Sequence, residues 1–454
     1  MNNFFNFSTD FKFTQITLLD INDFLIQDKY MSITIDYANI LPASFIAPKE
    51  VLAEPTFDWV DYVEKNHEQA LMSGNVRQGF TDLAGDTEIV NHINGKIARF
   101  QNQFDTIVVL GIGGSMLGVQ VLVDSLYVED KIIVHCLDNI DPFVIENLAQ
   151  TLDYSQTLFL VQTKSGGTPE TIAQFLYFKE QLQSFDLKLE NHFIFVTDPK
   201  VGYLRQLANE NSNIVALDIP ANVGGRFSVL TPIGLLISCL LDLDAQKLLD
   251  GAKNILDNEK YECAILANQQ LQLYKKGVDQ NVLMPYTSRL ATLAKWYIQL
   301  LSESIGKEFD IQGNKVNVGI TPVPALGATD QHSQAQLFKD GPFNKLVMTI
   351  QVQDYQANPI IADSAPAGLE YLQGITFGQL MDAELQGTRQ SLTESGKSNL
   401  NIKIDKVCEY TLGELLMMFE LSVAYLGNML NINTFDQPGV ERAKVLAREI
   451  LSKV

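Results

Sequence analysis

The chain has 454 residues, which at roughly 100–200 residues per domain predicts two or three domains and a sizeable core. Hydrophobic residues make up 46% and charged residues 19%, a globular balance that excludes a largely disordered chain. With 33 Lys and Arg against 54 Asp and Glu, the formal net charge is −21. Such an acidic surface argues against nucleic acid and anionic membranes as partners, and any anionic ligand needs a local cationic site.

The first 95 residues predict a mostly helical N-terminal segment, with a helix around Asp61–Ser73. From Thr106 onward, short apolar runs alternate with segments of helical length, such as Met116–Tyr127 and Thr168–Gln183. Each run is too short for a helix and is bounded by turn residues, so we predict strands at Thr106–Leu110, Ile132–Leu137, Thr157–Val161, Phe193–Val196 and Ile214–Leu217. Apolar strands that alternate with helices predict a parallel sheet covered by helices on both faces.

The most apolar run lies between Arg226 and Asp242. It contains Pro232 and Gly234 and is shorter than the ~20 residues that cross a bilayer, so it predicts a buried helix. The N-terminus lacks the pattern of a secretory signal, and we expect a soluble, cytoplasmic protein. No cysteine belongs to a CxxC pair, which indicates free buried thiols in a reducing compartment (Cys136, Cys239, Cys263 and Cys408).

The same alternation returns in the second half of the chain. The predicted strands are Asn281–Pro285, Val316–Ile320, Lys345–Ile350 and Leu400–Ile404. The predicted helices are Tyr261–Lys276, Arg289–Ile305, His332–Phe338, Phe377–Gly396 and Leu412–Leu430, followed by a tail helix from about Val440. We therefore expect an N-terminal segment (1–95), two α/β domains (96–245 and 246–431) and a C-terminal tail (432–454).

Loops that follow parallel strands are where ligands bind, and several of them carry chemically suggestive residues. Gly111–Gly118 (GIGGSMLG) follows the first strand, and its glycines and the helix start that follows suit a close anion. It matches neither the dinucleotide fingerprint nor the P-loop, and a tight strand-to-helix turn explains it equally well.

Thr163–Thr171 (TKSGGTPET) follows the third strand and groups three hydroxyls with a cation and two glycines at a helix start. This combination suits a phosphate group. An N-cap followed by an acidic first turn is the alternative. It explains Thr168 but neither Lys164 nor the glycine pair, so we favour a phosphate cradle.

Arg226 stands between glycines and an apolar helix, where a guanidinium needs an anionic partner. That partner is either a structural carboxylate or a charge that develops in a reaction.

Gln299 and Glu303 are four residues apart and share one helix face. Glu303 falls in a mostly apolar last turn, where burial and the helix C-terminus make a carboxylate a stronger proton acceptor. It is then a general base, with a solvated surface glutamate as the alternative.

His332 lies at a predicted loop-to-helix start. No second His or Cys has metal-ligand spacing to it, so we predict no metal site. An acid–base role stays open beside an ordinary packed or surface histidine. Lys444 lies early in the last helix, where an exposed cation is the usual interpretation. Together, a phosphate cradle, Arg226, Glu303, His332 and Lys444, without a cofactor motif, suit proton transfer on a phosphorylated small molecule.

Six segments of this chain occur in the order seen in the glucose-6-phosphate isomerase family, which the chain therefore resembles: GIGGSMLG, TKSGGTPET, GGRFSVLTPIGLL, ESIGK, QHSQAQL and FDQPGVERAK. The resemblance runs from about Thr106 to Lys444, and the length resembles the shorter bacterial form. It implies two sugar-isomerase (SIS) domains, each a five-stranded parallel sheet flanked by helices, and no cofactor. The chain departs from the family's usual residues at Gly167, Ile305, Ala328 and Asp330.

The resemblance also implies roles for individual residues. Those that resemble the substrate- and phosphate-binding loops are Gly114, Ser115, Thr163, Lys164, Ser165 and Thr168. Glu303 matches the base and Arg226 the arginine beside the reacting carbons. Gln299 and Gln437 match glutamines of the substrate site. His332 matches a ring-opening histidine from the neighbouring subunit of a homodimer, and Lys444 the lysine beside the ring oxygen.

The implied reaction interconverts glucose 6-phosphate and fructose 6-phosphate. His332 and Lys444 would open the sugar ring, Glu303 would move a proton between C2 and C1 through a cis-enediolate, and Arg226 would stabilise its charge. One alternative is a regulator of SIS fold that binds a sugar phosphate without catalysis, although binding alone needs none of the proton-transfer groups. Another is an isomerase of mannose 6-phosphate or an amino sugar, which the sequence does not separate.

Overall fold

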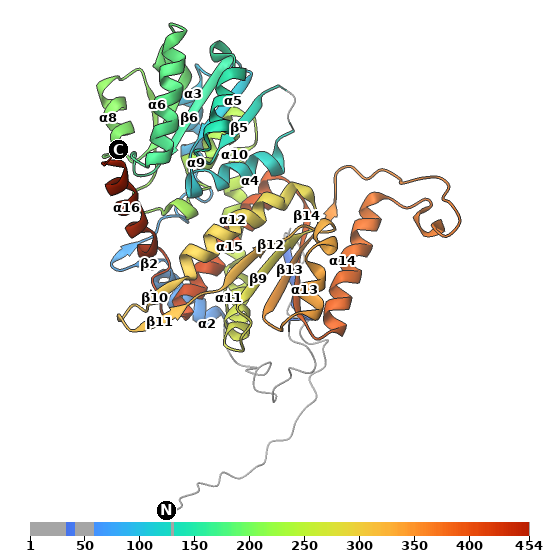
Figure 1. Cartoon of the computed structure of the whole chain (residues 1–454). Helices are drawn as coiled ribbons and strands as arrows, with labels where there is room; N and C mark the ends of the chain where they lie inside the picture. Colours follow the sequence, from blue (N-terminus) through green and yellow to red (C-terminus); the bar gives the residue numbers. More distant parts are fainter. Residues whose placement is uncertain (1–32, 41–58, 129–130, 454) are drawn as a thin grey trace, which may run out of the picture.

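The computed structural model describes residues 33–40, 59–128 and 131–453, and it contains two five-stranded sheets (Figure 1). Much of the predicted N-terminal segment, residues 1–32 and 41–58, lies outside the described residues. No helix in the described part of the chain is long and apolar enough to span a membrane.

The first sheet is entirely parallel, in the order β5-β4-β6-β7-β8. Its strands match the five predicted ones within two residues at each end: β4 (Thr106–Leu110), β5 (Ile133–Leu137), β6 (Thr157–Thr163), β7 (Phe193–Thr197) and β8 (Val215–Asp218). Along β4, Val108 and Leu110 belong to one buried cluster, whereas Ile107 and Val109 belong to another. This alternation buries both faces of the sheet, as an apolar parallel strand requires.

Helices cover each face of the first sheet. On one face lie α5 (Pro142–Thr151), α6 (Pro169–Ser184) and α8 (Tyr203–Glu210), and on the other α3 (Thr87–Ile97), α4 (Leu117–Leu126) and α9 (Pro232–Leu240). Every residue of α9 is buried, which confirms the helix predicted from the most apolar run.

The second sheet has the order β1-β14-β13-β9-β12. Four strands are parallel: β9 (Gln280–Pro285), β12 (Thr321–Pro324), β13 (Lys345–Asp354) and β14 (Ser398–Lys406). The fifth, β1 (Ile33–Asp36), comes from the N-terminal segment and runs antiparallel to β14. The α/β fold class is confirmed, but the expectation of five parallel strands here is wrong by this one strand. β1 is only four residues long and lies in a segment with few other signals, so the sequence did not predict it.

The predicted strand Val316–Ile320 is also corrected. Its first residues fall in β11 (Lys315–Val318), which pairs antiparallel with β10 (Lys307–Phe309) in a separate hairpin. The strand that joins the sheet is β12, which contains Pro322 and Pro324 and so looked unlike a strand. β12 lies at the edge of the sheet, the one position where a strand tolerates proline.

The two sheets share one apolar core. On the inner face of the second sheet lie α11 (Lys260–Tyr274), α12 (Ala291–Ile305) and α15 (Glu409–Met429), and on the outer face α13 (Ala335–Asp340) and α14 (Phe377–Glu394). α12 contacts both α15 and α4, which belongs to the first half of the chain (Figure 1). The domain boundaries stay a prediction, but this shared core fixes α12 against the first sheet's carboxyl edge.

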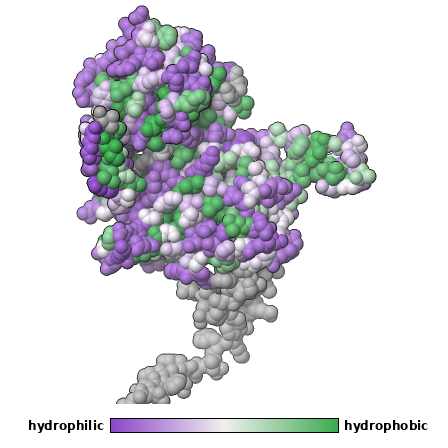
Figure 2. Space-filling view, viewed as in Figure 1, coloured by the Kyte–Doolittle hydropathy of each residue, from purple (hydrophilic) through white to green (hydrophobic). Residues whose placement is uncertain are grey.

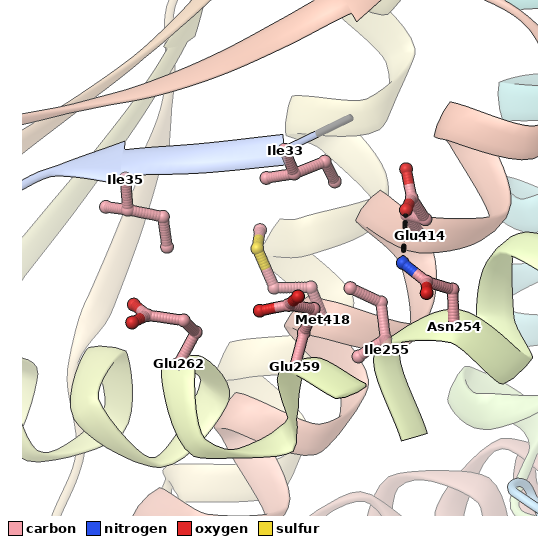
Figure 3. A pocket seen from close by; sticks show the side chains of 8 residues that line it. All are labelled: Ile33, Ile35, Asn254, Ile255, Glu259, Glu262, Glu414 and Met418. Atoms are coloured by element: carbon pink, nitrogen blue, oxygen red, sulfur yellow. Dashed lines mark hydrogen bonds between the residues drawn. The ribbon is translucent and has the colours of Figure 1, made fainter. Parts of the chain in front are cut away.

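Three glutamates line a small pocket beneath β1, between α15 and the π-helical turn η6 (Ile255–Glu259) (Figure 3). Ile33 and Ile35 of β1 cover it. Glu414 accepts a 2.8 Å hydrogen bond from the Asn254 amide. Burial raises the pKa of Glu414 to about 8 and that of Glu259 to about 7, and it also raises the pKa of Glu262.

We expect Glu414→Gln to stabilise the protein at alkaline pH. A carboxyl whose folded pKa is raised contributes stability that is fully present below the unfolded pKa and is lost as pH rises through the folded value. For Glu414 that window runs from about pH 4.5 to about 8. Glutamine keeps the hydrogen bond to Asn254 and never ionises, so the free energy of unfolding should rise by about 2–4 kcal/mol at pH 8.5.

Urea unfolding at pH 5 and pH 8.5 measures this effect. Glu394→Gln, a change at an exposed carboxylate of α14, is the control and should alter neither value. Equal pH dependence in Glu414→Gln and wild type would contradict the assignment.

Candidate active site

The candidate site lies where the strand order of the first sheet reverses. β5 and β6 flank β4 on opposite sides, and ligands of open parallel sheets bind at the carboxyl ends of the strands at such a point. The turn η3 (Gly113–Ser115) follows β4 there, and the loop Thr163–Thr168 follows β6. Two loops predicted from the sequence are therefore neighbours in space.

Three hydroxyls gather in the second loop. The Thr163 hydroxyl lies 2.7 Å from that of Thr168 and 3.3 Å from that of Ser165, and the last two are 3.2 Å apart. Thr168 occupies the N-cap position of α6, yet its side chain caps no helix amide. Its hydroxyl instead joins the cluster in front of the helix start, where an anion is favoured. This geometry supports the phosphate cradle over a simple N-cap.

Lys164 connects the cradle with the loop that leads to Arg226. Its ammonium donates to the carbonyl oxygens of Ala221 (2.8 Å) and Val223 (2.7 Å). Burial lowers its pKa. Two of its three protons are thus used within the protein, and one remains for a ligand.

Arg226 lies in the turn η5 (Gly225–Phe227) and is 4% exposed. Its guanidinium donates to five groups: Ser304 Oγ (2.8 Å), Glu303 Oε2 (3.2 Å), Gln437 Oε1 (2.9 Å) and the carbonyl oxygens of Thr434 (2.5 Å) and Asp436 (3.2 Å). Burial lowers its pKa, although Glu303 and Asp436 oppose that shift. The partner that the sequence required is therefore Glu303, together with backbone carbonyls.

Glycines bring the first loop against this arginine. A Cβ on Gly114 would stand 2.6 Å from the Arg226 amide nitrogen, so η3 and η5 touch backbone to backbone. A Cβ on Gly113 would meet the Gln299 amide nitrogen at 2.9 Å. The Gly113–Ser115 turn thus fits between η5 and the last turns of α12.

Glu303 lies one turn beyond Gln299 on α12, and its side chain is 33% exposed. One carboxylate oxygen accepts from the Gln299 amide (3.0 Å) and the other from Arg226. The carboxylate is held at two points and remains open to solvent. Glu303 is thus partly solvated, but unlike a free surface glutamate it is held by Gln299 and Arg226.

His332 and Lys444 do not belong to this group. Within the described residues, no hydrogen bond or ion pair joins either side chain to Arg226 or Glu303. His332 is exposed in η8 (Thr329–His332), beside Gln331, whose amide binds the Tyr286 hydroxyl at 2.8 Å. Lys444 is exposed on α16 (Glu441–Leu451) and pairs with Glu441 at 2.7 Å.

The sequence did not single out three contributors to the site. Ser304 and the 434–436 backbone bind Arg226, and Lys307 binds the backbone of Glu303 and Asp436. The sequence could have pointed to Lys307, because this cation follows Glu303 by four residues within the segment QLLSESIGK. Thr434 and Asp436 also line a cavity of about 600 Å³, bounded by the α2 (Trp59–Ala70) to β2 (Met72–Ser73) turn and the β10–β11 hairpin. In the described parts of the chain, no group of three or more His, Cys, Asp or Glu could hold a metal ion.

The two-sheet architecture defines an α/β protein of the sugar-isomerase (SIS) fold class. The structure of tagatose-6-phosphate ketose/aldose isomerase from Escherichia coli shares the fold, with a TM-score of 0.52 and 14% identity over 88% of this chain and 98% of that chain. A more specific similarity follows from the sequence. The phosphoglucose isomerase family model matches residues 95–454, and the chain belongs to this family.

Individual relatives agree with that assignment. The glucose-6-phosphate isomerase of Carboxydothermus hydrogenoformans is 37% identical over 93% of this chain and 95% of its own length. A glucose-6-phosphate isomerase of Thermus thermophilus is 36% identical over 82% of this chain and 90% of its own length. A crystal structure of a hypothetical protein from Thermus thermophilus has a TM-score of 0.80 and 34% identity, covering 92% of this chain and 99% of that one.

Proposed function

We propose that this chain is a glucose-6-phosphate isomerase in which Glu303 transfers the proton between the first two carbons of the sugar. Family membership supports the reaction. The observation that carries the site is the Arg226–Glu303 pair at 3.2 Å, whose carboxylate is one-third exposed to solvent. A regulator that only binds sugar phosphate would not need a carboxylate held in this way.

Different residues would bind different parts of the substrate. The cradle of Thr163, Ser165 and Thr168 receives the phosphate, together with the remaining N–H of Lys164. We place the sugar near Ser115 and Gln299, between the cradle and the carboxylate, so that binding energy at the phosphate positions the far end of the sugar.

Proton transfer follows at that far end. With the ring opened, Glu303 takes the proton from C2 and returns it to C1, which one carboxylate can do because the carbons are adjacent. Arg226, fixed by five acceptors, offers positive charge to the enediolate oxygens without having to reorganise. Gln437, which accepts from Arg226, borders the same oxygens. The role of Lys444 beside the ring oxygen is proposed from the family resemblance, since Lys444 pairs with Glu441 on α16 in this structure.

The direct test is conversion of fructose 6-phosphate in a coupled assay, repeated in heavy water. We expect glucose 6-phosphate as the product, with deuterium incorporated at C2. Product without deuterium under slow turnover would contradict proton transfer, and faster turnover of mannose 6-phosphate would favour that alternative substrate.

We also propose that the enzyme is a homodimer with shared sites, acting in the cytoplasm. The helix α12 starts after the carboxyl end of β9 and returns along the sheet for ~22 Å. Glu303 thus lies near the amino edge, whereas His332 follows β12 and lies at the carboxyl edge. Opposite edges of one sheet favour a His332 supplied by a second copy.

A projecting arm, residues 355–376, supports association of this kind. It extends from the body between β13 and α14 (Figure 1), and Figure 2 shows apolar surface on it. Its exposed residues include Ile360, Leu369 and Tyr371. Exposed apolar side chains on an extended arm are typical of a surface that a partner covers.

Mixing two inactive variants tests the shared site. We expect Glu303→Gln and His332→Ala homodimers each to lose most activity. The exchanged mixture should regain up to about a quarter of the wild-type rate, because about half of its dimers are heterodimers and each heterodimer has one intact site of two. Activity after mixing and exchange measures it, with each variant mixed with itself as the control. No recovery, despite subunit exchange shown by mass spectrometry, would contradict the shared site.

A further inference from the structure

Lys307 is a buried cation beside the site to which the proposed mechanism gives no role. It begins β10, four residues after Glu303, and its side chain is 5% exposed. Its ammonium lies 2.5 Å from the carbonyl oxygen of Glu303 and 2.8 Å from that of Asp436. It also lies 3.6 Å from the Asp436 carboxylate. A buried ammonium is stable only with acceptors and negative charge close to it, and these three oxygens provide them.

The contacts of Lys307 and Arg226 close a ring. Arg226 binds the carboxylate of Glu303 and the carbonyl of Asp436, and Lys307 binds the carbonyl of the same two residues. The Asp436 carbonyl oxygen is shared by both cations. Glu303 is thereby held by its backbone and its side chain at once.

This ring of contacts links two segments that are far apart in the sequence, the end of α12 and the loop after α15. Glu303 lies in the last turn of α12, where carbonyl groups lack helical partners. Asp436 lies in the loop between α15 and α16 that also carries Gln437. Among the hydrogen bonds and ion pairs of the described residues, only those of the Arg226 side chain would still join the end of α12 to this loop if Lys307 were removed.

We infer that Lys307 is a positioning residue of the isomerase site, which holds the Glu303 carboxylate in place by tying the end of α12 to the 434–437 loop. The inference rests on the proposed function. Burial and the nearby Arg226 lower the pKa of Lys307 to about 8, while Asp436 and Glu303 oppose that shift. In the described part of the chain, the charged groups that face Lys307 are Arg226 of η5, Glu303 of α12 and Asp436 of the loop.

Two variants and a control test this role. Lys307→Met removes the ammonium but keeps an unbranched stem, and Lys307→Arg keeps a cation. Lys315→Met is the matched control, because Lys315 lies in the same hairpin with an exposed ammonium 2.9 Å from Glu308. We expect Lys307→Met to lower kcat about 100-fold, since a small misplacement of a reacting group costs about that much, with KM changed less than about threefold. Lys315→Met should match the wild type.

The pH profile separates positioning from simple stabilisation. Above about pH 8, loss of the Lys307 proton should lower the wild-type kcat, and Lys307→Arg should abolish this fall because guanidinium does not titrate there. Unchanged kcat in folded Lys307→Met would overturn the inference. If that variant does not fold, an alkaline fall unchanged in Lys307→Arg would overturn it instead. An inactive wild-type chain would overturn the proposed function itself, and this role with it.

Discussion

Glu303→Gln should lower kcat by roughly 10³–10⁴-fold, the range that a positioned general base contributes. The amide cannot accept the C2 proton, yet it occupies the same volume. It also keeps one of the two hydrogen bonds of the carboxylate, because its oxygen can face either Gln299 or Arg226, with the amide nitrogen opposite the other donor. Substrate binding at the hydroxyl cradle should therefore change little, and KM should stay within a few-fold.

Two measurements check this expectation. The coupled assay gives kcat and KM, and NMR follows exchange of the C2 proton with heavy water, which should slow by the same factor. Glu308→Gln is the control, since Glu308 lies five residues further on with an exposed carboxylate paired to Lys315. Turnover within tenfold of wild type in Glu303→Gln would remove Glu303 from its role as the base.

The sequence predicted those parts of the site that strand ends determine. The cradle loop and the Gly113–Ser115 turn follow β6 and β4, as predicted. Their adjacency comes from the parallel pairing of these two strands, which the sequence did not specify. The pairing of Arg226 with Glu303, in contrast, could not be predicted from strand ends. It joins residues 77 apart in the sequence and depends on how α12 packs against α4, which periodicity does not specify.

Other features lacked a signal for physical reasons. The 434–436 loop contributes carbonyl oxygens, which every residue type provides, so no side-chain motif marks it. β1 is four residues long, and β12 contains two prolines that only its edge position permits. For His332 and Lys444, the assignment rests on resemblance, because their contacts would form with a second copy or with a moved α16.

Arg226→Lys should disable the site while preserving its charge. Five acceptors surround the guanidinium, and an ammonium has three donors, so at least two acceptors lose their partner. Each buried acceptor left unpaired costs about 1–3 kcal/mol, so the free energy of unfolding should fall by about 2–6 kcal/mol. The loss of a rigidly held positive charge near the enediolate should lower kcat by about 10²–10³-fold.

The two losses can be measured separately, because urea unfolding reports stability, whereas kcat is taken at a temperature at which the variant remains folded. Arg389→Lys is the control for burial alone, since Arg389 is 12% exposed and binds Asp36 of β1 at 2.9 Å, away from the site. It should lose stability without losing kcat. If Arg226→Lys behaved in the same way, Arg226 would be a structural anchor of the 434–436 loop. The stabilisation of the enediolate would then have to come from another cation, and Lys307, whose charge already interacts with that of Glu303, would be the first candidate.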